Sequence, residues 1–303
     1  MSVMTTMPPR LGEAFERVQS DIDSAFDAFL PVPDDSRARL VEAMRYAAIG
    51  AGKRMRPLLL VATSELFGVN RNAAINAGCA VEAIHAYSLI HDDLPCMDDD
   101  AMRHGKPSVH KAFDDATAVL AGDCLHALAF DILTQLDTSA DPFVRSELVA
   151  TLARASGHGG MVGGQAIDLE SVGKSLALPQ LETMHRHKTG ALIETSVRIG
   201  ALTAPSVNEQ ALASLTQYAK ALGLAFQVQD DLLDIEGDTT VIGKPQGSDV
   251  ARAKPTYPAL LGVAGAREHL AALLENAQDS LRAFGSEADP LRAMADYVVA
   301  RTH

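Results

Sequence analysis

Apolar residues in this chain recur at the spacing of a helix face. The two clearest series are Leu212, Leu215, Ala219, Leu222 and Phe226, and Leu270, Leu273, Leu274, Ala277, Leu281 and Phe284. Side chains three or four positions apart lie on one side of an α-helix, whereas a half-buried strand alternates every second residue. Convincing alternation is absent between the Gly and Pro residues that punctuate the chain. The sequence therefore predicts an all-α fold.

The length and the apolar content favour one large domain. The 303 residues are 47% hydrophobic, which is enough material for a sizeable core. The segment 237–249 is marked by Gly and Pro, but it is short enough to stay within a single domain. We expect one domain over 1–303, with residues 1–10 flexible.

The charge balance excludes some classes of partner. The chain has 26 Lys and Arg against 39 Asp and Glu, a formal net charge of −13. This balance argues against a broad nucleic-acid-binding face and against an anionic-membrane anchor. Anionic small molecules stay possible where bound cations and a local basic cluster reverse the sign.

Cysteine usage and the N-terminus indicate a cytoplasmic protein. The three cysteines have neither the spacing of a metal finger nor that of a redox pair. Residues 1–10 carry no basic segment followed by an apolar stretch, and no run approaches the ~18 consecutive apolar residues of a spanning helix. We therefore expect no membrane association.

Five acidic residues lie within positions 92–100, at the end of an apolar helical stretch. Asp92 and Asp98 are six positions apart, a spacing that does not stack on a regular helix. Pro95 predicts a break at which the chain folds back. Both carboxylates could then face one ion.

A second acidic cluster, 230–234, also closes an amphipathic helix. Asp230 and Asp234 are four positions apart and share a face with Gln227. Either cluster alone fits a solvated helix face or a turn. Both, however, lie beside apolar residues, and negative charge at a helix C-terminus opposes the macrodipole. A hard cation removes both penalties, so two facing clusters predict several Mg²⁺ ions bridged by a diphosphate.

Basic residues beside Gly or Pro recur around these clusters. They are Lys53, Arg54 and Arg56 in a loop before a helix, Arg103 and Lys106 after the first cluster, and Lys188, Lys244 and Lys254 further on. Each group alone fits a solvated turn. Together they supply the cations that a site for two diphosphates needs.

In this order, the motifs resemble the trans-prenyl diphosphate synthase family and, within it, the bacterial members that make farnesyl diphosphate. The resemblance runs from about residue 40 to 262. Its segments are GKRMRP, DDLPCMD, GKPSVHK, GMVGGQAIDLE, HRHKTGALIE, DDLLD, GDTTVIGKPQGSD and AKPTYPALLG.

The resemblance implies a helical bundle of the isoprenoid synthase type around a central cavity, three Mg²⁺ ions per active site and a homodimer. It also implies an enzyme that joins isopentenyl diphosphate to dimethylallyl or geranyl diphosphate. The implied reaction has the diphosphate leave, an allylic cation form, the isopentenyl double bond attack it and a proton depart.

The same resemblance assigns roles to single residues. Asp92, Asp98 and Asp230 would ligate Mg²⁺, with Asp93, Asp231 and Asp234 adjoining. Arg103, Lys188, Thr189, Gln227, Lys244 and Lys254 would hold the allylic substrate, and Lys53, Arg56 and His85 would hold isopentenyl diphosphate. The aspartates with Arg103, Lys188 and Lys244 would carry the catalytic step. The spacing agrees for His85, which precedes Asp92 by seven residues and so shares its helix face.

Three positions depart from the family pattern or refine it. His104 falls where the family has an arginine that grips isopentenyl diphosphate, and Ala101 stands where relatives often carry an acid. Tyr87 precedes Asp92 by five residues, where the family uses an aromatic ring to floor the pocket and limit the product to fifteen carbons. Ordinary packing explains Tyr87 equally well from geometry alone.

Other readings stay open at this point. Geranyl and geranylgeranyl diphosphate are rival products. A class I terpene cyclase would share the fold and the first aspartate motif, but it would lack the GKR loop and the second DDxxD. A catalytically weak regulatory subunit is a further alternative, which His104 and Ala101 favour and the intact aspartates oppose.

Overall fold

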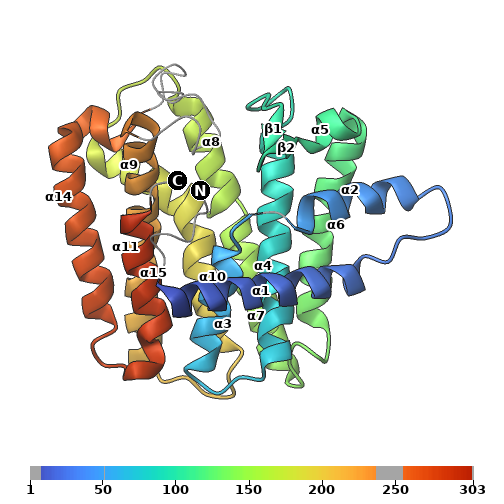
Figure 1. Cartoon of the computed structure of the whole chain (residues 1–303), viewed down its shortest axis with the longest axis horizontal. Helices are drawn as coiled ribbons and strands as arrows, with labels where there is room; N and C mark the ends of the chain where they lie inside the picture. Colours follow the sequence, from blue (N-terminus) through green and yellow to red (C-terminus); the bar gives the residue numbers. More distant parts are fainter. Residues whose placement is uncertain (1–7, 51, 237–254, 302–303) are drawn as a thin grey trace.

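The computed structural model describes residues 8–50, 52–236 and 255–301, and this part of the chain is a bundle of helices (Figure 1). The α-helices are α1 Pro9–Phe29, α2 Ala38–Ala48, α3 Met55–Glu65, α4 Arg71–Asp92, α5 Val109–Ala112, α6 Asp115–Thr134, α7 Pro142–Ser156, α8 Met161–Ser171, α9 Leu178–His185, α10 Ala191–Leu202, α11 Glu209–Glu236, α14 Tyr257–Ser280 and α15 Asp289–Ala300. A π-helical turn, η2 Arg186–Gly190, joins α9 to α10, and a 3-10 turn, η3 Ser286–Ala288, precedes α15.

Strands make up very little of the described chain. β1 Met102–Arg103 and β2 Lys106–Pro107 form one antiparallel pair, with Arg103 opposite Lys106. The pair lies at one end of the bundle beside α4 and α5 (Figure 1). The prediction of an all-α fold is therefore confirmed.

Helix α4 is the centre of the N-terminal half. It packs against α6 and α3, and α1 crosses the bundle in front of it (Figure 1). The side chain of Asn70 caps its start by accepting from the Asn72 amide at 2.9 Å. Asp114 caps α6 in the same way, accepting from Thr117 at 2.7 Å. These caps satisfy amides that a helix start leaves without partners.

One connected hydrophobic core extends from Leu11 to Val298. Helices α3 and α10 approach closely within it, and the approach requires glycine at position 200. A Cβ added at Gly200 would lie 2.5 Å from the Leu60 carbonyl oxygen. Helices α4 and α6 are long and apolar enough to cross a membrane by length and composition. Such helices also occur as core helices, and 72% of the α4 window is buried.

Candidate active site

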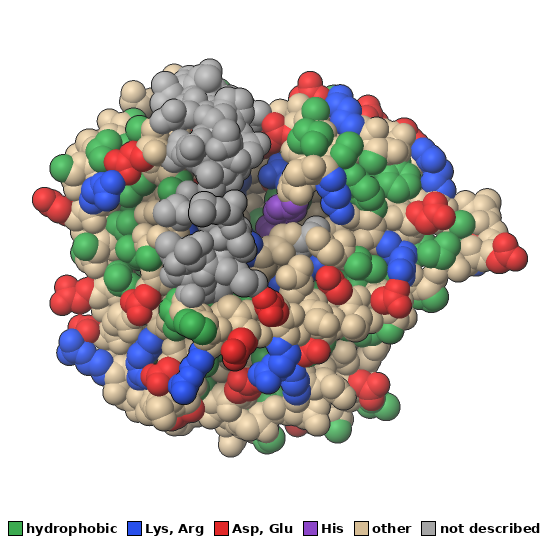
Figure 2. Space-filling view, in the orientation of Figure 1, with side chains coloured by type: hydrophobic (Ala, Val, Ile, Leu, Met, Phe, Trp, Pro, Cys, Tyr) green, Lys and Arg blue, Asp and Glu red, His purple; other side chains and the backbone are tan. Residues whose placement is uncertain are grey.

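A cavity of about 270 Å³ lies among α2–α4, the β1–β2 pair, α11 and α15. Its wall includes Lys53, Arg56, His85, Arg103 and His104, which were all predicted as substrate-binding residues. Asp93 from the first aspartate cluster and Phe226, one turn before the second, line the same cavity. The first motif thus reaches the cavity through Asp93, and the second lies near it, since Asp230 acts on the charge of Lys53. Figure 2 shows histidine and basic side chains at the rim of a recess in this face.

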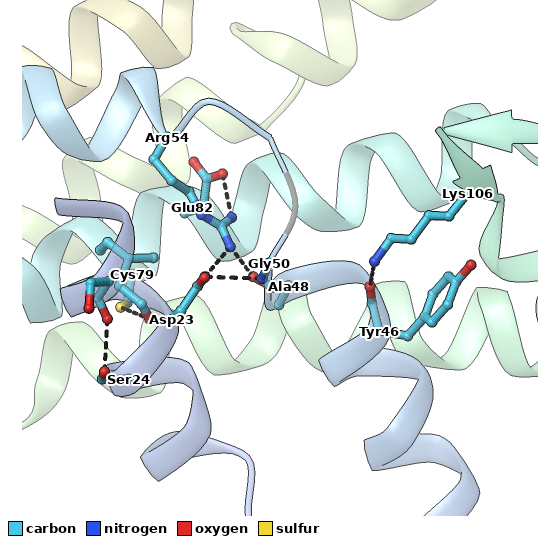
Figure 3. A network of polar contacts seen from close by, with 11 residues as sticks. Asp23, Ser24, Tyr46, Ala48, Gly50, Arg54, Cys79, Glu82 and Lys106 are labelled. Carbon is cyan, nitrogen blue, oxygen red and sulfur yellow. Dashed lines mark hydrogen bonds and ion pairs between the residues drawn. The ribbon is translucent and has the colours of Figure 1, made fainter. Parts of the chain in front are cut away.

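The loop between α2 and α3 brings cations to the cavity through an unusual backbone. Gly50 and Gly52 have φ of +69° and +70°, and Arg54, the residue before α3, has φ of +52°. Glycine adopts this left-handed region without strain, whereas arginine does so at a cost. The Arg54 side chain offsets that cost with ion pairs to Asp23 and Glu82 (Figure 3).

Cations crowd one another on this wall. Partial burial and the nearby Arg301 lower the pKa of Lys53 to about 8, although Asp230 opposes the shift. Burial also lowers the pKa of Arg56, against the pull of Glu82 and Asp230. The Arg56 Nε is buried and has no hydrogen-bond partner. A polyanion would supply the missing acceptor and relieve the repulsion.

Two imidazoles lie among these cations. Burial and the charge of Arg56 hold the pKa of His85 well below its ordinary value. Partial burial and Arg103 also lower the pKa of His104, which lies at the exposed rim. Both rings are therefore neutral at neutral pH in the unliganded protein.

The chain folds back at the first aspartate cluster. The Asp98 amide donates to the Asp92 carbonyl at 2.9 Å, and the Asp99 amide donates to the Leu94 carbonyl at 3.1 Å. The turn therefore joins the two residues that a regular helix would separate. The pKa of Asp92 is raised to about 6, chiefly by burial; Asp98 and Asp93 contribute to the rise, whereas Lys188 and Arg103 oppose it.

The neighbouring carboxylate of Asp93 is committed to another role. It is buried and forms a two-oxygen ion pair with the Arg103 guanidinium, whose Nε lies 3.1 and 3.2 Å from its oxygens. Asp100 lies 3.4 Å from the same guanidinium. Asp93 thus holds Arg103 at the cavity wall.

In the second cluster, too, the first two aspartates differ in burial and in partner. Asp230 pairs with Arg301, which also stacks over the Phe226 ring at 3.9 Å. Asp231 is buried and accepts from the Gln227 amide at 3.0 Å and from the Tyr257 backbone at 2.9 Å. The Thr189 hydroxyl donates to the side-chain oxygen of Gln227 at 3.2 Å, and Asp234 follows Asp230 by one turn of α11.

Lys188 lies in the π-helical turn, across from the first cluster. Its ammonium pairs with the buried Asp168 of α8 at 2.5 Å. The approach of α8 requires glycine, because a Cβ at Gly164 would lie 2.1 Å from the Lys188 backbone nitrogen. The charge of Lys188 acts on Asp92, so this turn brings a cation to the carboxylates.

Several predicted residues are not part of the cavity wall. The described ones are Asp92, Asp98, Lys188, Thr189, Gln227, Asp230, Asp231, Asp234 and Tyr87. Lys244 and Lys254 lie outside the described residues. Tyr87 is not among the residues that line the cavity. Its ring faces α6 and packs edge-on against His126, with a centroid distance of 5.0 Å. Its role as a product ruler stays a prediction.

Sequence reasoning missed the counter-ions of these residues. Asp168 lay inside a quoted motif but carried no role, while Asp23, Glu82 and Arg301 gave no local signal. Each pairs with a residue far away in the chain, so no spacing rule could have found it.

The donor set fits Mg²⁺ held mainly by substrate oxygens. Among the described residues, no three His, Cys, Asp or Glu side chains gather closely enough to hold a metal alone. Asp92 and Asp98 offer hard oxygens on one turn, and Asp230 offers another on α11. Mg²⁺ prefers few carboxylates together with phosphate oxygens and water, which matches this arrangement.

We expect Asp92→Asn to stabilise the metal-free fold. The pKa of Asp92 is raised from 3.8 to about 6, so its ionised form is disfavoured in the folded protein. Wild-type stability should therefore fall, relative to the variant, as pH rises from about 4 to about 6, and the gap should then stay at about 3 kcal/mol. Urea unfolding in a chelator at several pH values measures this. A gap that is constant from pH 4 to pH 7 would contradict the cause assigned to the shift.

Comparison with known proteins gives the family. The polyprenyl synthetase family profile matches residues 37–288. Farnesyl diphosphate synthase of Escherichia coli is 47% identical over 97% of this chain and 98% of its own length. The enzyme of that name from Geobacillus stearothermophilus is 48% identical over 88% of this chain and 90% of its own length. A solved structure described as an FPP/GFPP synthase from Zymomonas mobilis, in the apo state, is 50% identical in sequence. The match covers 96% of this chain and 99% of that one, with a TM-score of 0.87.

Family profile, relatives and fold agree with the resemblance predicted from the motifs. The chain belongs to the polyprenyl synthetase family and has its all-α isoprenoid synthase fold.

Proposed function

We propose that the protein is a short-chain trans-prenyltransferase that condenses isopentenyl diphosphate with dimethylallyl or geranyl diphosphate to give farnesyl diphosphate. The observation that carries this proposal is one cavity lined by several cations and by Asp93 of the first aspartate motif, with Asp230 of the second motif close enough to act on Lys53. Relatives named farnesyl diphosphate synthase, at 44–48% identity over most of their length, support the same activity.

Two groups of residues divide the binding. Lys53, Arg56 and His85 line the cavity and are suited to the isopentenyl diphosphate. Arg103 and Lys188 lie beside the first cluster, held by Asp93 and Asp168, and are suited to the allylic diphosphate. Fixed partners keep these cations in place without reorganisation when charge develops on the leaving group.

Mg²⁺ held by Asp92, Asp98 and Asp230 would neutralise the departing diphosphate. We propose three ions per site. Arg103 and Lys188 would share that charge, and the neutral His85 would leave the allylic cation unopposed by a further positive group. The released diphosphate is the base that takes the proton, so no side chain needs to serve as one.

Incubation of the purified protein with isopentenyl and dimethylallyl diphosphates tests the proposal. Fifteen-carbon product should form with Mg²⁺ and vanish in chelator. Asp98→Ala should lower kcat by at least about a hundred-fold, because it removes charge stabilisation of the leaving group. Exposed Asp137→Ala, outside the site, is the control. Cyclised hydrocarbon would indicate a terpene cyclase, and no turnover would indicate a regulatory subunit.

Tyr87→Ala should lengthen the product. Tyr87 lies on α4, five residues before Asp92, and its ring packs against His126 of α6. Removal of the ring opens space between the two helices. We expect twenty-carbon and longer chains, with the rate of the first condensation nearly unchanged. Chromatography of dephosphorylated products measures the distribution. A distribution identical to that of wild type would remove the ruler role.

His104 should make isopentenyl diphosphate binding weaken as pH rises. The pKa of His104 lies below the ordinary 6.5 in the free protein, and a bound diphosphate would raise it. KM should therefore rise with pH between the pKa of the free protein and that of the complex. His104→Arg stays charged, so at pH 8 it should lower this KM about ten-fold, the worth of one charge-assisted hydrogen bond.

The comparison of His104→Arg with wild type at each pH cancels the ionisation of the substrate itself. Equal KM values for the two proteins from pH 6 to pH 8 would show that His104 does not contact the diphosphate.

We also propose that the protein works in the cytoplasm as a homodimer of one-domain subunits. Helix α6 exposes apolar side chains, including Val119 at 40% and Leu120 at 53%, which a second copy could cover. Sedimentation at the mass of a single 32.1 kDa chain would contradict the dimer.

A further inference from the structure

The last turn of α2 receives cations from two separate parts of the cavity wall. A helix end leaves its final carbonyls without helical partners and carries partial negative charge. Arg54, from the loop after α2, donates to the Ala48 carbonyl. Lys106, from β2, donates to the Tyr46 carbonyl at 2.6 Å. Figure 3 shows the two side chains reaching this one turn.

Arg54 ties its loop to three helices. Its side chain is 2% exposed, and its guanidinium lies 2.6 Å from Asp23 of α1 and 2.9 Å from Glu82 of α4. Asp23 also accepts from the Gly50 amide at 3.2 Å, so the start of the loop is held as well. Lys53 and Arg56 flank Arg54 and are thereby fixed relative to α2.

Lys106 ties the β1–β2 pair to the same turn. Its ammonium lies 4.2 Å from the centre of the Tyr46 ring in addition to its bond to the Tyr46 carbonyl. The Tyr46 hydroxyl donates to the Pro107 carbonyl at 2.7 Å, which adds a second bond between the two elements. The turn of this pair carries His104, whose ring approaches the loop at Gly52.

We propose that the C-terminal turn of α2 is the common anchor that sets the separation of the two isopentenyl-diphosphate-binding elements, with Arg54 and Lys106 as positioning residues. The inference rests on the proposed function, because it takes Lys53, Arg56 and His104 as ligands of one diphosphate. The diphosphate must meet both elements at once, so their separation controls its affinity.

Direct truncation of Arg54 is a poor test, since it would leave the buried Glu82 and the half-buried Asp23 without a counter-ion. Three milder variants test the anchor instead. Lys106→Met removes one bond to α2, Tyr46→Phe removes the hydroxyl bond without changing charge, and Asp23→Asn weakens the hold on Arg54. Lys111→Met is the charge-matched control, because Lys111 is exposed and pairs with Asp99 instead of α2.

Steady-state kinetics should separate the two substrates. We expect KM for isopentenyl diphosphate to rise about ten-fold in Lys106→Met and about three-fold in Tyr46→Phe and Asp23→Asn, because small displacements of a binding element are costly. KM for the allylic diphosphate, kcat and the thermal unfolding midpoint should stay close to wild type. Lys111→Met should leave all of these nearly unchanged.

Three outcomes would overturn the inference. One is an unchanged KM for isopentenyl diphosphate in Lys106→Met and Asp23→Asn. Another is an equal rise for both substrates, which would indicate general loosening. The third is a rise in Lys106→Met with none in Tyr46→Phe, which would make Lys106 a ligand of the substrate. A wild-type protein that turns over no isopentenyl diphosphate would instead sink the proposed function, and this inference with it.

Discussion

Burial of charged groups, with like charges close together, is the constraint on which the site depends. Lys53, Arg56 and Arg301 crowd one wall of the cavity, and Asp92 meets Asp98 and Asp93 on the turn after α4. Neither arrangement is favourable by itself. The cations are suited to an anionic ligand, and the carboxylates are suited to a metal cation. The fold holds both in place with an apolar core and with buried ion pairs such as Arg54 with Glu82. Binding of a charged ligand is thereby favoured over the free state.

The two adjacent aspartates that begin each motif differ in burial and in contacts, although they are the same residue type. Asp93 and Asp231 are buried and hold other protein groups, namely Arg103, Gln227 and the Tyr257 backbone. Asp92 and Asp230 are less buried and stay at the boundary of the site. In each motif, therefore, the second carboxylate fixes the surrounding scaffold, and the first, which in Asp230 also pairs with Arg301, is the one that we propose as a magnesium ligand. Such support holds a site in the geometry its chemistry needs.

Much of this organisation could be read from local pattern. Periodicity predicted the helices, Pro95 predicted the turn that joins Asp98 to Asp92, and the motifs predicted the family. The pairings that hold the site could not be predicted, because they join distant positions. Lys188 and Asp168 are 20 residues apart, Lys106 and Tyr46 are 60 apart, and Arg301 and Asp230 are 71 apart. Only the packing of α8, α2 and α15 brings these partners together, and no spacing rule specifies that packing.

The π-helical turn at Arg186–Gly190 has a consequence for how this gene can change. A π turn accommodates one residue more than regular α pitch, and each residue advances the helix by about 100°. Loss of one codon there would restore an ordinary α-helix and swing Lys188 away from Asp168 while leaving α9 and α10 intact. A change of length in this stretch therefore acts on Lys188 as strongly as a substitution of Lys188 itself. Lineages of this fold should conserve the residue count between α9 and α10.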